Sequence, residues 1–173
     1  MKKAVFLDRD GVLNNELGDY VLDINDFVVS EGVPEALKIL KEKGFYLIVV
    51  TNQSGIAKGK YNSDLVDECH KVLQEKSGGI IDAFYFSPFH PDYDTESLLR
   101  KPDSLMIEKG AARFNINLSQ SWMVGDKKRD IEAGQKAGCK TLYIYHKDYH
   151  DAEAEKMATH SAESLIKAIE LIN

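Results

Sequence analysis

The chain has few of the residues that mark specialised protein classes. Among its 173 residues are two cysteines, Cys69 and Cys139, whose spacing fits neither a metal site nor a disulfide framework. The longest apolar run, residues 45–50, is far too short to cross a bilayer. Only four apolar residues, 4–7, precede Asp8, so we expect no signal peptide. These shortages predict a protein of the reducing cytoplasm that does not bind membranes.

Basic residues are also in the minority. The chain has 22 lysines and arginines against 28 aspartates and glutamates, which gives a formal net charge of −6. Because a general nucleic-acid binder usually has the opposite balance, we predict no nucleic-acid partner. The negative field would repel an anionic substrate unless cations gather locally around it. Length and composition otherwise predict one globular domain, residues 1–173, and we expect it to act as a monomer.

Short apolar runs alternate with amphipathic patterns along most of the chain. Runs rich in Val, Ile, Phe and Tyr predict strands at 4–7, 45–50, 83–86, 122–124 and 141–145. Apolar residues at helical spacing predict helices at 34–43, 63–76, 104–114, 129–136 and 161–172. Strands that alternate with helices predict an α/β fold with a doubly wound, mostly parallel sheet.

Two details complete the predicted organisation. The polar stretch 147–160 predicts a loop or an irregular helix, and Ser161 is the expected N-cap of the last helix. Between the first two strands there is room for one helix and a loop only. We therefore expect no large cap domain inserted there.

Three of the predicted strands run directly into polar residues. The first ends in Asp8-Arg9-Asp10-Gly11, the second in Thr51-Asn52-Gln53-Ser54-Gly55, and the fourth in Gly125-Asp126. In an open α/β sheet, ligands bind outside the carboxyl ends of the strands. The sequence therefore predicts a polar site at one edge of the sheet.

The acidic residues at this edge indicate a divalent cation. Asp8 and Asp10 are two residues apart, so in extended backbone their side chains lie on the same side. With Asp126 they would make an oxygen-only site of the kind that Mg²⁺ prefers, and without a cation the carboxylates would repel one another. Taken alone, the Asp-x-Asp-Gly pattern fits solvated loop acids equally well.

Other residues of these loops are suited to holding a phosphate. The Thr51 hydroxyl and the N–H groups that follow it form a plausible phosphoryl cradle, although Thr51 alone is better explained as a helix cap. Arg100-Lys101 and Lys127-Lys128-Arg129 would supply the local positive charge that a phosphate needs. Taken alone, Arg100-Lys101 is better explained as an exposed basic pair, and Lys127-Lys128-Arg129 also fits a solvated face.

Together and in this order, the four motifs resemble those of the haloacid dehalogenase superfamily of phosphatases. The resemblance covers residues 4–145 and rests on Asp8-Arg9-Asp10-Gly11, Thr51-Asn52-Gln53-Ser54-Gly55, Arg100-Lys101-Pro102 and the segment from Gly125-Asp126 through Asp130 to Gly134. The first two motifs, with Asn14, are similar to those of the D,D-heptose 1,7-bisphosphate phosphatases. Histidinol-phosphate phosphatases form the sister branch, and histidinol phosphate or another small phosphorylated metabolite is the alternative substrate.

The resemblance implies a role for each catalytic residue. Asp8 would be the nucleophile that forms an aspartyl-phosphate. Asp10 would protonate the leaving alkoxide, a role that needs a carboxyl protonated near neutral pH, which nearby negative charge can provide. Thr51 and Lys101 would hold the transferred phosphoryl group.

It also implies the metal and substrate ligands. Asp8, the backbone carbonyl of Asp10 and Asp126 would bind Mg²⁺, and Asp130 would orient Lys101 or a water molecule on the metal. The 7-phosphate would leave, and the 1-phosphate would stay on the sugar. The substrate contacts would come from Asn52, Gln53, Ser54, Arg100 and Lys127.

A receiver domain of a signalling system is the alternative from another class. Such a domain also combines an α/β fold with an acidic pocket, a threonine and a lysine. However, its phospho-accepting aspartate ends the third strand, where this chain has Ser87-Pro88. The Asp-x-Asp-Gly spacing also places an acid beside the nucleophile, which favours the phosphatase.

The chain departs from the family pattern in two loops. The substrate-facing loop, residues 15–20, is one residue longer than in typical heptose enzymes, and the second departure lies in the loop that precedes Arg100. Many members of both branches carry a structural zinc ion there, whose cysteine and histidine ligands correspond to Ser87, Phe89, Ser97 and Leu99 in this chain. None of these four is a zinc ligand. We therefore predict that packing alone holds this loop.

The lack of zinc ligands at these four positions predicts that the freshly purified protein contains no tightly bound zinc. Elemental analysis by mass spectrometry is the measurement. One equivalent of zinc per chain would contradict the prediction.

Overall fold

The computed structural model describes all residues, 1–173, and contains one six-stranded sheet. Its strands are β1 (Lys3–Leu7), β2 (Phe45–Asn52), β3 (Ala83–Ser87), β4 (Trp122–Gly125), β5 (Lys140–Ile144) and β6 (His160–Ala162). They lie in the order β3-β2-β1-β4-β5-β6, and every pair is parallel. The predicted α/β class with a parallel sheet is confirmed, and no large cap domain is present.

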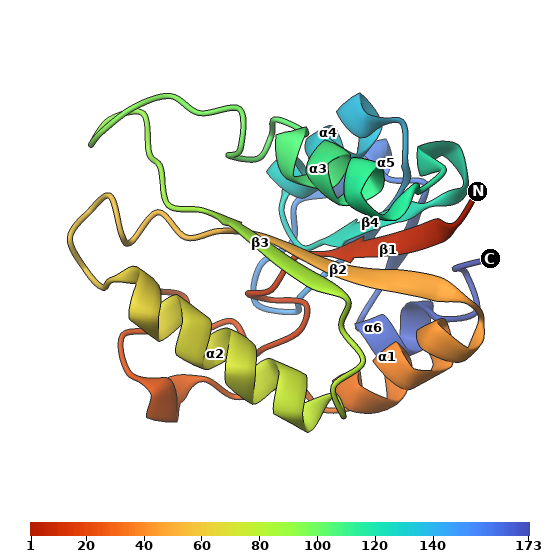
Figure 1. The fold of residues 1–173 in the computed structure, drawn as a ribbon, viewed down its shortest axis with the longest axis horizontal. Coiled ribbons are helices and arrows are strands. Elements are labelled where there is room, and N and C mark those ends of the chain that lie inside the picture. Colours follow the sequence, from red (N-terminus) through yellow and green to blue (C-terminus); the bar gives the residue numbers. More distant parts are fainter.

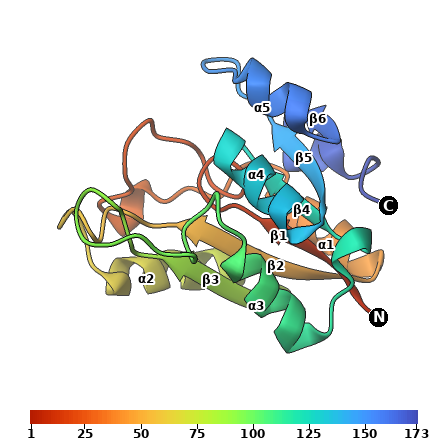
Figure 2. The ribbon, with the colours of Figure 1, turned by 90° about the horizontal axis from the view of Figure 1, so that it is seen from above.

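Helices cover both faces of the sheet. They are α1 (Val33–Glu42), α2 (Ser63–Lys76), α3 (Leu105–Phe114), α4 (Lys128–Ala137), α5 (Ala152–Met157) and α6 (Leu165–Ala168). Two short 3₁₀ helices, Ile24–Asp26 and Leu118–Gln120, lie in the loops. Figure 1 shows α1, α2 and α6 on one side of the strands and α3, α4 and α5 on the other, and Figure 2 shows the same layers from above.

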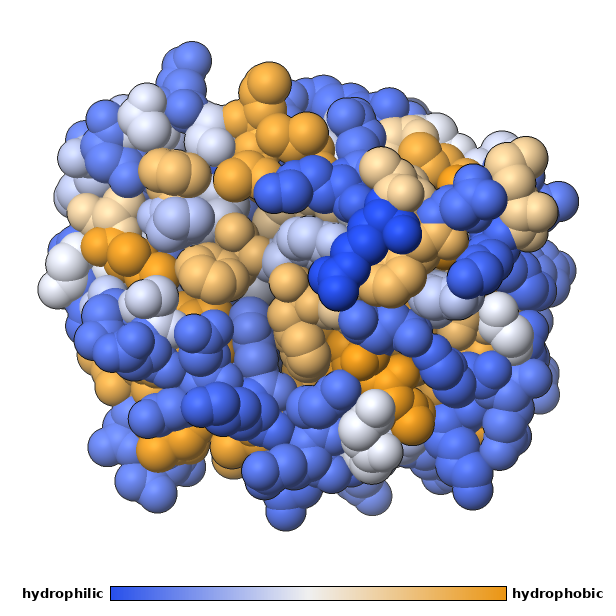
Figure 3. Space-filling view, in the orientation of Figure 1, coloured by the Kyte–Doolittle hydropathy of each residue, from blue (hydrophilic) through white to orange (hydrophobic).

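The alternation of side chains along the strands builds two main apolar cores, one on each face of the sheet. In β1, Val5 and Leu7 join the apolar cluster under α1, α2 and α6, whereas Ala4 and Phe6 join the one under α3 and α4. A strand buried on both faces has no polar side to show, so it reads as a continuous apolar run. On the face of Figure 3, apolar residues lie in small groups among hydrophilic ones. None of the helices is long and apolar enough to span a membrane.

The C-terminal region differs from its prediction. Residues 160–162 form β6 beside β5, and the last helix begins only at Leu165. The Ser161 hydroxyl caps no helix but donates to the Glu155 carboxylate at 2.8 Å. A three-residue strand at the edge of a sheet has too few residues to show the alternation by which strands are recognised. Three residues of the expected apolar stripe, Leu165, Ile169 and Ile172, are nevertheless buried.

A buried histidine of α2 generates a prediction about stability. The His70 imidazole stacks on the Phe84 ring, with centroids 4.6 Å apart, and its Nε2 has no hydrogen-bond partner. Burial, followed by the positive charge of Arg9, lowers the pKa of His70 from 6.5 to about 3. The unfolded chain therefore takes up a proton near pH 6.5 that the folded chain does not accept until about pH 3.

We expect this histidine to weaken the fold as the pH falls below 6.5. Its contribution to the unfolding free energy should fall by up to about 1.4 kcal/mol per pH unit. Urea unfolding of the wild type and of His70→Phe between pH 7.5 and pH 4.5 measures it. The wild type should lose stability more steeply than the variant over this range, and parallel curves would contradict the assignment.

Candidate active site

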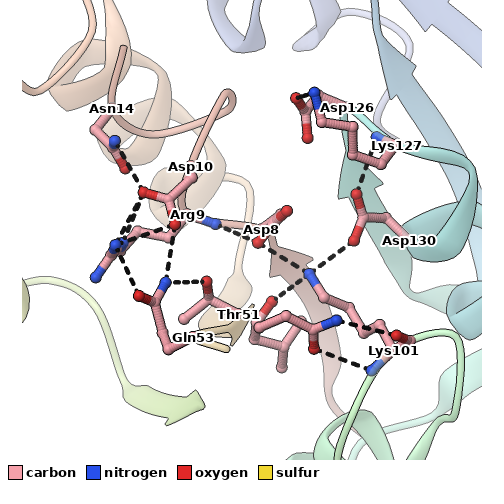
Figure 4. A network of polar contacts seen from close by, with 12 residues as sticks. Asp8, Arg9, Asp10, Asn14, Thr51, Gln53, Lys101, Asp126, Lys127 and Asp130 are labelled. Atoms are coloured by element: carbon pink, nitrogen blue, oxygen red, sulfur yellow. Dashed lines mark hydrogen bonds and ion pairs between the residues drawn. The ribbon is translucent and has the colours of Figure 1, made fainter. Parts of the chain in front are cut away.

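Three adjacent strands deliver the predicted residues to one edge of the sheet. Because β2, β1 and β4 are neighbours and parallel, their carboxyl ends bring Thr51, Asp8 and Asp126 together. All three residues are buried, and none is more than 3% exposed. Figure 4 shows their side chains converging from the strand ends. The structure thus brings these three predicted residues together at one edge of the sheet.

The Lys101 side chain lies at the centre of this cluster. Only 1% of the residue is exposed, and its Nζ lies 2.9 Å from Asp8 and 2.7 Å from Asp130 (Figure 4). It also donates to the carbonyl oxygen of Val50 at 2.8 Å. Burial would lower the pKa of Lys101, but the charges of Asp130 and Asp8 outweigh it and raise this pKa. The ammonium is therefore charged and fixed beside the expected nucleophile.

Asn52 holds the lysine in place. Its side-chain oxygen accepts from the backbone N–H of Lys101, and its side-chain nitrogen donates to the backbone carbonyl of the same residue, both at 3.0 Å. Because both the nitrogen and the oxygen of this amide already make hydrogen bonds to Lys101, Asn52 is better suited to positioning the lysine than to binding a substrate. The neighbouring Arg100 donates to the Phe89 carbonyl at 3.1 Å and lines the cavity described below.

Three buried carboxylates form a group that fits a metal ion. Carboxylate oxygens of Asp8, Asp126 and Asp130 all lie within 4.8 Å of one another. Burial, followed by repulsion from Asp130, raises the pKa of Asp8 to about 7, and burial and the same neighbour also raise the pKa of Asp126. The buried Oδ1 of Asp126 has no hydrogen-bond partner. A divalent cation would relieve this repulsion and satisfy that oxygen.

Asp10 does not share this environment. Its carboxylate pairs with the Arg9 guanidinium at 2.9 Å and accepts from Gln53 at 2.8 Å and from Asn14 at 3.1 Å. Burial would raise the pKa of Asp10, but Arg9 and these hydrogen bonds outweigh it and lower this pKa. The expected rise in the pKa of Asp10 was wrong, because the arginine between the two aspartates folds back onto the second. Of these two aspartates, it is Asp8 whose pKa is raised.

Gln53 connects Asp10 to the second strand. Its Nε2 donates to the Thr51 hydroxyl at 2.8 Å as well as to Asp10, and its Oε1 accepts from Arg9 and from the Tyr61 hydroxyl. The residue is 2% exposed. Gln53 therefore orients both the threonine and the carboxylate.

A cavity of about 420 Å³ opens beside these residues. The predicted residues that line it are Asp10, Asn52, Gln53, Ser54, Arg100 and Lys127. Its remaining walls include Arg9, Glu16, Tyr20, Tyr61, Arg129 and Tyr149. The sequence had singled out Arg129 only as part of a basic run, and Tyr20 only as the end of the substrate-facing loop 15–20. Nothing in it marked Tyr61 and Tyr149, which come from loops without a recognisable period. Four cationic side chains line this cavity despite the acidic net charge.

The chain is similar to several proteins of known family. Residues 98–168 match a family described as HAD-hydrolase-like. A D-glycero-beta-D-manno-heptose-1,7-bisphosphate 7-phosphatase of Haemophilus ducreyi is 40% identical, with 99% of each chain covered. A D-glycero-alpha-D-manno-heptose-1,7-bisphosphate 7-phosphatase of Burkholderia mallei is 39% identical, with 91% of this chain and 85% of that one covered. These relatives are phosphatases, so the receiver-domain alternative gains no support.

A solved structure shares the fold. The crystal structure of D,D-heptose 1,7-bisphosphate phosphatase from B. bronchiseptica, complexed with magnesium and phosphate, superposes with a TM-score of 0.80. It is 27% identical in sequence, and the match covers 98% of this chain and 97% of that chain.

The Lys101 environment predicts a large and specific loss of stability. In chelator, Lys101→Met should lower the unfolding free energy by about 3–5 kcal/mol, because it leaves two buried carboxylates without their cation. The matched control is Lys136→Met, since Lys136 pairs with Asp103 at 3.1 Å on the surface, where a pair contributes at most about 1 kcal/mol. Urea unfolding measures both variants, and equal losses would contradict the prediction.

Proposed function

Because the chain belongs to the haloacid dehalogenase-like family of heptose 1,7-bisphosphate 7-phosphatases, we propose that it removes the 7-phosphate of D-glycero-D-manno-heptose 1,7-bisphosphate. The chain is an enzyme of the phosphoric monoester hydrolase class, and its relatives match over nearly their whole length. Within the site, the main support for this function is the buried Lys101 ammonium beside Asp8. This pairing places a cation where a phosphoryl group would meet a carboxylate. Such an arrangement suits phosphoryl transfer, which depends mainly on positioning and charge neutralisation.

The chemistry divides between the two aspartates. A carboxylate oxygen of Asp8 attacks phosphorus, the P–O bond to the sugar breaks, and an aspartyl-phosphate forms. Asp10, which lines the cavity, gives a proton to the leaving alkoxide and then takes one from the water that releases phosphate. The incoming phosphate adds negative charge beside Asp10, which opposes the effect of Arg9 on its pKa. Thr51 and Lys101 hold the phosphoryl oxygens.

We propose Mg²⁺ as the metal of the acidic group. Asp8, Asp126 and the backbone carbonyl of Asp10 would hold it, and Asp130 would keep Lys101 in place. Bound there, the metal would neutralise negative charge on the transferred phosphoryl group. The acidic group consists of three aspartates and includes no cysteine or histidine. Oxygen ligands alone are the donor set that this hard cation prefers.

The cavity supplies the contacts for the rest of the substrate. Arg100, Lys127 and the N–H groups near Ser54 would bind the sugar hydroxyls and the second phosphate, with Arg129 as a further cation. A substrate with two phosphates explains why so many cations line one cavity of an acidic protein. That residues 1–173 form one domain, which acts as a monomer in the cytoplasm without nucleic acid or membrane, remains our prediction.

A phosphate-release assay tests the substrate and the nucleophile together. With Mg²⁺, the wild type should hydrolyse one anomer of heptose 1,7-bisphosphate at least tenfold faster than histidinol phosphate. Asp8→Asn should reduce turnover by more than about a thousandfold, because an amide does not replace the attacking carboxylate. Both anomers belong in the panel, since the two relatives are named for opposite ones.

The control is Asp92→Asn, an aspartate whose side chain is 81% exposed and does not line the cavity. It should keep the wild-type rate. Turnover by Asp8→Asn at the wild-type rate would refute the nucleophile, and faster hydrolysis of histidinol phosphate would refute the substrate.

A further inference from the structure

The segment that follows β5 reaches across to the metal-binding edge of the sheet. His146 donates from Nε2 to the carbonyl oxygen of Gly11 at 2.9 Å, and its ring stacks on Tyr149 with centroids 4.7 Å apart. The Tyr149 hydroxyl in turn donates to Oδ2 of Asp126. Two aromatic side chains of this segment are therefore anchored on the two loops that carry the metal ligands. The proposed reaction assigns neither of them a role.

The two oxygens of Asp126 have opposite surroundings. Oδ2 accepts from Tyr149, lies 3.1 Å from the Lys127 ammonium and is 3.9 Å from the His146 ring nitrogen. It also packs so closely on Gly11 that a Cβ there would lie 2.3 Å from it. Oδ1 is buried and has no hydrogen-bond partner. The protein thus holds the carboxylate by one oxygen and leaves the other available.

The Tyr149 ring also contacts the ammonium group of Lys127. Lys127 Nζ lies 3.6 Å from the ring centroid, and Glu16 lies 3.4 Å away from the same ammonium. A cation over an aromatic face is held electrostatically by the ring. This contact does not need the hydroxyl, so the ring and the hydroxyl can be separated by substitution.

We propose that Tyr149 is a positioning residue for the metal site. Its hydroxyl fixes Oδ2 of Asp126 so that Oδ1 faces no competing donor and is free to bind the cation. Side chains that hold a metal ligand in this way commonly change metal affinity by about 10- to 100-fold when they are removed. The inference rests on the proposed metal-dependent function, but not on the identity of the sugar.

Calorimetric titration of the full chain with Mg²⁺ alone tests the proposal without any substrate. Tyr149→Phe keeps the ring, with its contacts to Lys127 and His146, and removes only the hydroxyl. It should weaken Mg²⁺ binding by about 10- to 100-fold. The matched control is Tyr145→Phe, which removes a hydroxyl from the same segment that has no contact with Asp126, and it should stay within about twofold of the wild type.

Activity gives a second readout. With any phosphate monoester that the enzyme turns over, the Mg²⁺ concentration for half-maximal rate should rise in Tyr149→Phe by the same factor. At saturating Mg²⁺, kcat and the substrate KM should return to wild-type values, which a general structural defect would not allow.

Three results would overturn the inference: unchanged Mg²⁺ affinity in Tyr149→Phe, equal weakening in both variants, or a wild type that binds no Mg²⁺. Weakened Mg²⁺ binding confined to Tyr149→Phe would support the inference even if no heptose bisphosphate were hydrolysed. In that case the substrate proposal alone would fail.

Discussion

The burial of one ammonium group constrains the whole site. A lysine that is almost fully removed from water is stable only with carboxylates in contact, because the cost of desolvating its charge is several kcal/mol. Lys101 finds them in Asp8, at the end of β1, and in Asp130, on α4, and it finds a carbonyl on β2. Strand, helix and loop must therefore all be in place at once. The geometry that suits phosphoryl transfer is also the one that satisfies this buried charge.

Charge is divided between two compartments of the site. Around Lys101 the three carboxylates outnumber the cation, which favours binding of a metal. On the cavity side, arginines and Lys127 outweigh their acidic neighbours, which favours binding of an anion. Asp10 and Arg9 lie at the boundary and neutralise each other. An acidic protein thus presents local positive potential to a phosphate while keeping negative potential for Mg²⁺.

The sequence predicted what depends on strand ends and missed what depends on packing across loops. Asp8, Thr51 and Asp126 were found because apolar runs mark parallel strands, whose ends must meet. Nothing local indicated that Arg9 would turn onto Asp10, since the direction of a long side chain depends on neighbours such as Gln53 and Asn14. Tyr149 lies in a polar stretch without period, and its contact with Asp126 exists only in the folded chain.

Two hydrogen bonds join the Asn52 side chain to the Lys101 backbone, at the end of the long loop that precedes this lysine. Because Asn52 of β2 holds the Lys101 backbone, the position of the ammonium does not rest on residues 88–99 alone, and Phe89 of this loop instead accepts a hydrogen bond from the cavity-lining Arg100. The loop can therefore act on the cavity through Arg100 while Lys101 stays anchored. A single amide side chain thus separates the placement of the catalytic lysine from the placement of the neighbouring arginine.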